Sequence, residues 1–174
     1  MLSDFLFCFR LLAFLGVSMY LIGLFLPRHW FGDGDKGWFS CFPREKGGKL
    51  YERVGIRQWK DKVPDMSRIS RRLTKKSISE KPTPDSLLGL IRETCVAELI
   101  HELLMLLGFL CYLIRRTKRT LFWVMVWALG NLPYVMIQRY NRPRLIRLRA
   151  HLLKQKASVS DETEAVTLPK GSSS

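Results

Sequence analysis

The fold is decided by the apolar stretch Leu87–Ile114, which reads LLGLIRETCVAELIHELLMLLGFLCYLI. As a helix, a stretch of about 28 residues at 1.5 Å per residue is long enough to cross the ~30 Å hydrocarbon core of a bilayer. Residues 103–114 carry no charge, whereas ionisable side chains are concentrated in the first half of the stretch. The stretch therefore predicts a membrane helix with polar groups on part of its surface.

Two further apolar blocks flank this stretch. Residues 5–26 are interrupted only by Arg10, and residues 121–137 follow a short basic turn. A cleaved signal peptide is the alternative for the first block. However, no Lys or Arg precedes it, Asp4 has the opposite charge, and no small-residue cleavage pattern follows it. We therefore predict an all-α membrane protein with about three apolar helices, the first of them retained.

The charge of the chain is strongly positive and unevenly distributed. The 174 residues carry 29 Lys and Arg against 15 Asp and Glu, a formal net charge of +14, and 47% of them are hydrophobic. The apolar content excludes intrinsic disorder of the whole chain, and four cysteines are too few for a disulfide-stapled secreted fold. Basic residues that flank membrane helices are explained by membrane topology, so no nucleic-acid partner is predicted.

Composition divides the chain into four regions. These are an N-terminal membrane helix (1–27), a long basic interfacial loop with amphipathic segments (28–86), a membrane helical hairpin plus an amphipathic helix carrying the site (87–154), and a disordered tail (155–174). Within the basic loop, Met66, Ile69 and Leu73 recur at helical spacing among basic residues. A basic amphipathic surface of this kind is typical of contact with anionic lipids.

The distribution of positive charge leaves two topologies open. The basic loop holds 15 Lys and Arg, the turn 115–120 holds four, and the chain from residue 138 onward holds eight. If all three blocks span the membrane, the loop and the tail are cytoplasmic, and the basic turn lies outside, against the positive-inside rule. A shallow hairpin made by the second and third blocks removes that conflict.

The ionisable residues of the second block share one side of the predicted helix. Relative to Glu93, a rotation of 100° per residue places His101 at about 80° and Glu98 at about 140°, whereas the opposite side is apolar. Glu98 and His101 are three residues apart and can share a proton. A carboxylate beside an imidazole is a general-base arrangement. A buried polar patch that fixes helix pairing is the alternative interpretation.

Metal binding is a further alternative for this segment. Glu-x-x-His occurs in di-iron helical bundles, but those sites need two copies and additional glutamates. Only one copy is present, and His29 and His151 lie in unrelated surroundings. We therefore predict no metal site and no resident cofactor.

A second polar group follows the third block, in the run NLPYVMIQRYNRPRL (131–145). Its guanidinium groups can bind phosphates in bidentate fashion, so a lipid headgroup or the phosphates of an acyl-CoA thioester are candidate ligands. Generic anchoring of positive residues at the membrane surface is the alternative. Pro143 suits the first turn of a following amphipathic helix. The candidate binding residues are Asn131, Gln138, Arg139, Asn141, Arg142 and Arg144.

Trp59 and Asp61 form a third and weaker candidate cluster. Trp59 is interpreted most simply as an interfacial anchor. Asp61 lies between Lys60 and Lys62, where an ordinary surface carboxylate is the simplest interpretation.

Three runs together resemble the glycosyl-4,4'-diaponeurosporenoate acyltransferases, small membrane enzymes that complete staphyloxanthin-type carotenoids. The runs are IRQWKDKVPD (56–65), ETCVAELIH (93–101) and NLPYVMIQRYNRPRL (131–145). The resemblance covers about residues 50–152, and Val96 departs from the basic residue found there in the family. It implies transfer of a fatty acyl chain to the C6 hydroxyl of the glucose on a glycosylated C30 carotenoid acid, in a bacterial cell membrane.

For this reaction we expect His101 to be the general base and Glu98 to orient it. Glu93 or Asn131 would position the sugar, and the three arginines would bind an anionic donor or headgroup. Expected partners are membrane lipids, the glycosylated carotenoid and a fatty acyl donor. The alternative is a non-catalytic membrane scaffold or lipid-interacting subunit. The candidate catalytic residues are His101, Glu98 and Glu93, and the candidate substrate-binding residues are Trp59, Asp61, Asn131, Gln138, Arg139, Asn141, Arg142 and Arg144.

Overall fold

The computed structural model describes residues 2–63 and 82–167, whose regular elements are all helices, joined by turns and with no strand among them. The elements are α1 (Leu2–Phe25), η1 (Arg28–Phe31), η2 (Gly37–Phe39), η3 (Pro43–Gly48), α2 (Lys49–Arg53), α3 (Ile56–Trp59), α5 (Pro84–Gly108), α6 (Leu110–Arg115) and α7 (Lys118–Thr167). Three stretches are long and apolar enough to cross a membrane: Ser3–Phe25, Pro84–Arg115 and Lys118–Ser160. The predicted all-α fold with three long apolar helices is confirmed.

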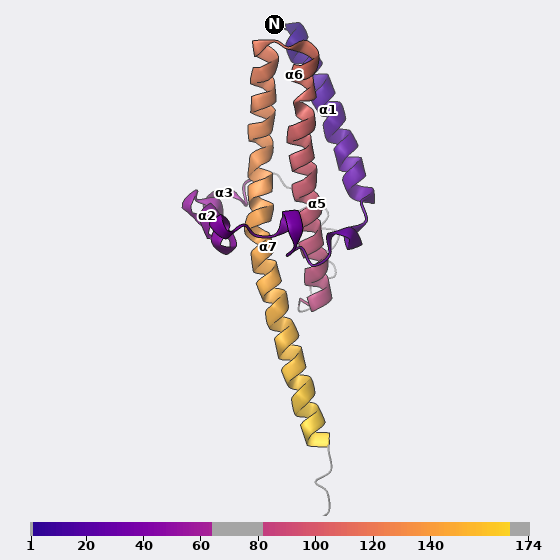
Figure 1. The fold of residues 1–174 in the computed structure, drawn as a ribbon, viewed down its shortest axis with the longest axis vertical. Helices are drawn as coiled ribbons and strands as arrows, with labels where there is room; N and C mark the ends of the chain where they lie inside the picture. Colours follow the sequence, from indigo (N-terminus) through magenta and orange to yellow (C-terminus); the bar gives the residue numbers. More distant parts are fainter. Residues whose placement is uncertain (1, 64–81, 168–174) are drawn as a thin grey trace, which may run out of the picture.

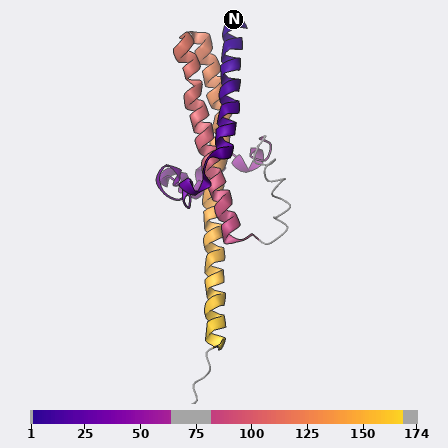
Figure 2. The same cartoon turned by 90° about the vertical axis from the view of Figure 1, so that its right-hand side faces the viewer.

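The three long helices run side by side (Figures 1 and 2). The start of α1 lies beside the turn that joins α6 to α7, and we call this end of the bundle the turn end. At the other end, which we call the loop end, residues 28–63 cross the long helices and place α2 and α3 beside α7 (Figure 1). Beyond the loop, the first turns of α5 still lie beside α7, and past the start of α5 the rest of α7 projects alone.

The start of α5 is set by a capping box. Thr83 Oγ1 accepts a hydrogen bond from the Ser86 backbone N–H at 3.2 Å, and Ser86 Oγ accepts one from the Thr83 N–H at 3.0 Å. Pro84 occupies the first helical position, where its missing N–H costs nothing. The helix therefore begins three residues before the apolar stretch. Phe109 alone separates it from α6, so the second block forms one nearly continuous rod.

The course of α7 differs from the prediction. We expected Pro143 to open a new helix, but α7 runs without interruption through both Pro133 and Pro143. An interior proline removes one backbone hydrogen bond and costs about 3 kcal/mol. Contacts with α5 or the loop flank both prolines and help to hold the backbone helical; they are made by Asn131, Tyr134, Arg142 and Arg144. The lower part of α7 is inclined to its upper part (Figure 1), as expected of a helix that contains prolines.

The predicted disorder of residues 155–174 is replaced by helix as far as Thr167. The Lys-Gln-Lys-Ala run at 154–157 consists of good helix formers, and it extends an existing helix without a new nucleation step. Residues 168–174 lie outside the described residues. So do Met66, Ile69 and Leu73, whose helical spacing stays a prediction.

Gly108 allows α5 and α7 to approach closely. A Cβ atom at this position would lie 2.7 Å from Trp127 Cδ1 and 3.0 Å from Trp127 Nε1. The Trp127 indole N–H donates to the Leu104 carbonyl at 2.9 Å, so the ring is held in place and cannot move without losing this bond. The helix contact therefore depends on the absence of a side chain at position 108.

We expect Gly108→Ala to lower the free energy of unfolding by about 1–3 kcal/mol, since the added methyl group overpacks the Trp127 contact. Gly16→Ala is the matched control, because its Cβ would meet the same Trp127 ring at an ordinary 3.8 Å. Denaturant unfolding of the detergent-solubilised protein measures both. Equal stability of the two variants would contradict the prediction.

Candidate active site

A buried carboxylate and two buried guanidinium groups lie between α5 and α7. Glu98 on α5 is 0% exposed. Arg139 Nε lies 2.7 Å from Glu98 Oε1, and Arg142 Nη2 forms an ion pair with Glu98 Oε2. Both arginines come from α7, three residues apart and therefore on one face of it. These two charge-assisted contacts offset part of the desolvation cost of burying a carboxylate.

The first arginine also anchors the loop. Arg139 Nη1 donates to Glu45 Oε1 at 2.9 Å, and Arg139 Nη2 donates to the Trp38 carbonyl at 3.1 Å. Glu45 is itself buried and accepts a hydrogen bond from the Tyr51 hydroxyl at 2.5 Å. Arg139 therefore ties α5, α7 and the loop elements η2 and η3 together.

The N–H groups of the second arginine, Arg142, also donate to several acceptors within the protein. Arg142 Nε donates to Thr94 Oγ1 at 2.9 Å, and Arg142 Nη2 donates to the Thr94 carbonyl at 3.1 Å. Its Nη1 donates to the Phe39 carbonyl at 2.7 Å, and its guanidinium carbon lies 5.4 Å from the centre of the Phe39 ring. We refer to Glu45, Glu98, Arg139 and Arg142 below as the buried charge cluster.

One turn further along α5, His101 meets two residues of α7. His101 Nδ1 lies 2.9 Å from Asn131 Oδ1, and the imidazole stacks on the Tyr134 ring with centroids 4.4 Å apart. Asn131 Nδ2 donates to the Trp127 carbonyl at 2.9 Å, which directs Oδ1 toward the imidazole. Because Oδ1 can only accept, the Nδ1 of His101 carries the proton. In the neutral ring, Nε2 is then the basic nitrogen.

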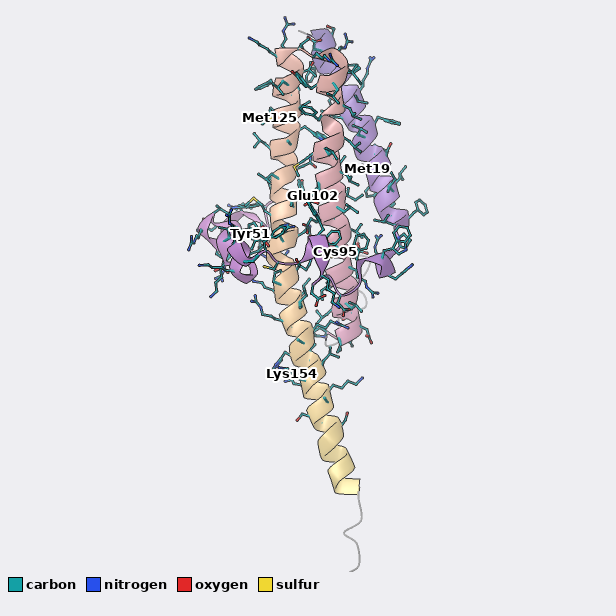
Figure 3. All side chains as sticks on the ribbon, in the orientation of Figure 1. Met19, Tyr51, Cys95, Glu102, Met125 and Lys154 are labelled. Atoms are coloured by element: carbon teal, nitrogen blue, oxygen red, sulfur yellow. The ribbon has the colours of Figure 1, made fainter. Side chains whose placement is uncertain are left out.

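The loop also reaches the residue next to His101. The indole N–H of Trp38 donates to Glu102 Oε2 at 2.7 Å. Figure 3 shows Glu102 and Cys95 on α5 near the level at which the loop crosses, with Tyr51 beside α7. The buried charge cluster holds the backbone of Trp38, and Trp38 holds Glu102, so the position of the loop is coupled to the surroundings of His101.

A family profile described as glycosyl-4,4'-diaponeurosporenoate acyltransferase matches residues 35–151. This range includes every residue of the site described above, but not α1. The chain belongs to this family. The acyltransferases of Staphylococcus aureus strains bovine RF122 / ET3-1, MRSA252 and Newman are each 31% identical to it over 126 residues, which is 71% of this chain and 74% of theirs. No solved structure matches.

In this acyltransferase, the partner of His101 differs from the one expected. We expected Glu98 to orient the imidazole, whereas the structure places Asn131 beside Nδ1 and sets Glu98 against two arginines. The physical reason is burial. A carboxylate without solvent is stabilised much more by two guanidinium groups than by a neutral imidazole.

The three arginines of the NLPYVMIQRYNRPRL run use their donors within the protein. Arg139 and Arg142 belong to the buried charge cluster, and Arg144 donates to Glu52 Oε1 at 2.5 Å and to the Tyr140 carbonyl at 2.8 Å. Their geometry favours a role in positioning the loop over the expected role of binding an anionic ligand.

The remaining predicted site residues are distributed over several places. Gln138 is buried and Asn141 half-buried on α7, near the buried charge cluster in sequence. Glu93 is largely exposed and accepts from Arg28 Nε at 2.7 Å. The Trp59 indole donates to the Val54 carbonyl at 3.1 Å, and Asp61 lies 3.7 Å from the Lys60 ammonium. The structure does not bring Glu93, Trp59 or Asp61 to His101.

Sequence reasoning missed Trp38, Glu45, Tyr51 and Tyr134. Two arginines three residues apart just beyond an apolar block indicate that an acidic residue pairs with them. The sequence does not show which acidic residue this is. Glu45 lies in a glycine-rich basic turn without periodicity, so no local pattern singles it out. Tyr134 follows Asn131 by three residues on α7, and this spacing is the one signal that could have identified it.

Protonation of Glu45 is expected to release the loop at low pH. Burial raises the pKa of Glu45, but hydrogen bonds from Tyr51, Arg139 and the Phe42 N–H outweigh burial and hold the pKa below its ordinary value of 4.5. The loop-released state binds protons more readily, so docking of the loop is stable above pH 4.5 and is lost as the pH falls through the lower, docked-state pKa. Hydrogen exchange of residues 37–48 measures this change.

Glu45→Gln is the control for this prediction, because the amide keeps the shape of the side chain but does not titrate in this range. Its exchange should lack the acid-induced increase. An identical acid-induced increase in the variant and in the unaltered protein would assign the effect to another group.

Proposed function

We propose that this protein transfers a fatty acyl chain to the C6 hydroxyl of the glucose in a glycosyl-4,4'-diaponeurosporenoate, completing a staphyloxanthin-like pigment. Membership of the family supports the reaction class. The observation that carries the proposal is the histidine whose tautomer is set by Asn131 on the facing helix. An imidazole with Nδ1 protonated and Nε2 basic is prepared to remove a proton from a hydroxyl group.

In the proposed reaction, Nε2 of His101 takes the proton of the sugar hydroxyl while the hydroxyl oxygen attacks the carbonyl carbon of the acyl donor. The Asn131 carboxamide stabilises the imidazolium by accepting from Nδ1, and the Tyr134 ring fixes the plane of the imidazole. The imidazolium then returns the proton to the leaving group. With an acyl-CoA thioester as donor, this group is the thiolate.

The buried charge cluster acts in this proposal by positioning. It holds the backbone of residues 38–39 against α5 and α7, and Trp38 in turn donates to Glu102, the residue that follows His101 in sequence. A hollow of about 330 Å³ between the loop and α7 is lined by Arg139, Arg142 and Arg147, among others. We place the polar part of the donor there, against Arg147, because Arg139 and Arg142 already donate within the protein. Contacts of the donor with Gln138 and Asn141 stay a prediction.

The depth of His101 in the membrane suits substrates that are themselves embedded in lipid. His101 precedes Arg115 by fourteen residues, or roughly 21 Å along the rod, so it falls inside a ~30 Å hydrocarbon core and toward the loop end. We propose a multi-pass protein of the bacterial cell membrane whose loop end, with most of the positive charge, is cytoplasmic. The sugar of an amphiphilic acceptor would reach this depth from the cytoplasmic leaflet.

Co-expression with a pathway that makes the glucosylated carotenoid tests the proposed function. Mass spectrometry of the extracted pigments should show a mass gain of one fatty acyl group that depends on this chain. The alternative function, a non-catalytic scaffold, predicts no new ester from the purified protein when it is supplied with acceptor and acyl-CoA. Absence of the ester in both experiments would overturn the acyltransfer proposal.

A further inference from the structure

An unexplained charge lies at the turn end of the bundle, far from His101. Arg10 is the one charged residue of α1 beyond Asp4, in a helix that is otherwise apolar up to Phe25. Asp4 lies 3.4 Å from Arg119 in the turn. Among the residues that the structure describes, no carboxylate pairs with Arg10. An ionisable group within a membrane helix is costly unless something neutralises it, so the position of Arg10 favours an anionic partner.

The side chain of Arg10 opens onto a hollow between α1 and α6. The hollow has a volume of about 520 Å³, within the range of small-ligand sites. Its apolar wall includes Leu6, Phe7, Leu11 and Phe14, and its second cation is Arg115 at the end of α6. The views in Figures 1 and 2 agree that the first turns of α1 lie beside this end of α6.

The second cation is held in place by an aromatic ring. The guanidinium carbon of Arg115 lies 4.7 Å from the centre of the Phe7 ring, a cation–π contact that joins the two helices across the hollow. No acidic residue lines the hollow. Two guanidinium groups above an apolar wall match a phosphate joined to an acyl chain, because guanidinium groups bind phosphate oxygens with paired hydrogen bonds.

We propose that this hollow binds one anionic phospholipid from the leaflet that contains the α6–α7 turn. Its phosphate lies between Arg10 and Arg115, at the level of Leu6 and Phe7. One acyl chain runs from there into the membrane along Leu11 and Phe14. The lipid supplies a negative charge for Arg10, which has no carboxylate partner among residues 2–63 and 82–167. It also reduces the conflict between the basic turn and the positive-inside rule, since the turn then faces bound anionic lipid. The site is separate from the proposed acyl transfer and does not depend on it.

The test measures binding of dioleoyl phosphatidylglycerol to the purified full chain in detergent by native mass spectrometry, with dioleoyl phosphatidylcholine and oleate as comparison ligands. One phosphatidylglycerol should bind in preference to phosphatidylcholine, which has the same chains but no net charge. Oleate bound as tightly as phosphatidylglycerol, or tighter, would assign the hollow to free carboxylates and overturn the proposal. So would equal binding of the two phospholipids.

Variants then locate the site. Arg10→Gln and Arg115→Gln should each weaken phosphatidylglycerol binding by about tenfold, the effect of losing one charge-assisted contact. Arg116→Gln is the matched control, because Arg116 lies in the same turn but does not line the hollow. It should bind as the unaltered protein does. Equal weakening in all three variants would show a general attraction to the basic turn and overturn the site. The comparison of the three ligands uses the unaltered protein, so it tests the proposal even if a variant fails to fold.

Discussion

His101→Ala is expected to lower the rate of ester formation by about 10²- to 10⁴-fold, the usual contribution of a general base. The protein should still insert and accumulate, because His101 is only half-buried and lies outside the buried charge cluster. The measurement is ester formation in isolated membranes supplied with acceptor and donor, normalised to the amount of protein. Loss of the imidazole removes the proton acceptor without removing the loop that positions Trp38 and Glu102.

His151→Ala is the matched control for this prediction. His151 lies on the exposed part of α7, so the same substitution there changes neither the site nor the core, and activity should be unchanged. Undiminished activity of His101→Ala would remove His101 from the mechanism. A loss of activity that follows a matching loss of protein would instead make His101 a structural residue.

The long helices were predictable because their signal is local. Length and hydropathy identify α1, α5 with α6, and the membrane part of α7, since each stretch must satisfy the bilayer by itself. Helix boundaries were less predictable. Pro143 has the properties of a helix start, and only the packing of α7 against α5 and the loop shows that it lies inside a helix.

The central members of the site on α5 and α7 were predictable, but the way in which they pair was not. Helical rotation correctly placed Glu98 and His101 on one side of α5, which the structure confirms by directing both toward α7. Which residue of α7 meets which residue of α5 depends on the height at which the two helices pack. That height is fixed by contacts remote in sequence, such as Gly108 against Trp127, so the assignment of the arginines to Glu98 and of Asn131 to His101 needed the structure.

Glu98→Ala is expected to cost about 3–5 kcal/mol of stability, because it leaves two buried guanidinium groups with only Glu45 as counter-charge. Denaturant unfolding in detergent measures this cost. Glu93→Ala is the control on the same helix. Glu93 makes one largely exposed ion pair with Arg28, and the loss of such a pair costs about 0–1 kcal/mol. Equal costs for the two variants would show that the buried charge cluster does not hold the fold together.

A quadruple substitution separates the two roles of the buried charge cluster. Replacing Glu45, Glu98, Arg139 and Arg142 together with Gln, Leu, Leu and Met removes all four charges of the cluster, and buried ion networks replaced as a whole often keep or gain stability. The same change removes the donors that hold the Trp38 and Phe39 carbonyls. We therefore expect much of the stability lost in Glu98→Ala to return while acyl transfer does not, because the loop no longer holds Trp38 against Glu102, the residue next to His101. Recovery of both would limit the buried charge cluster to a packing role.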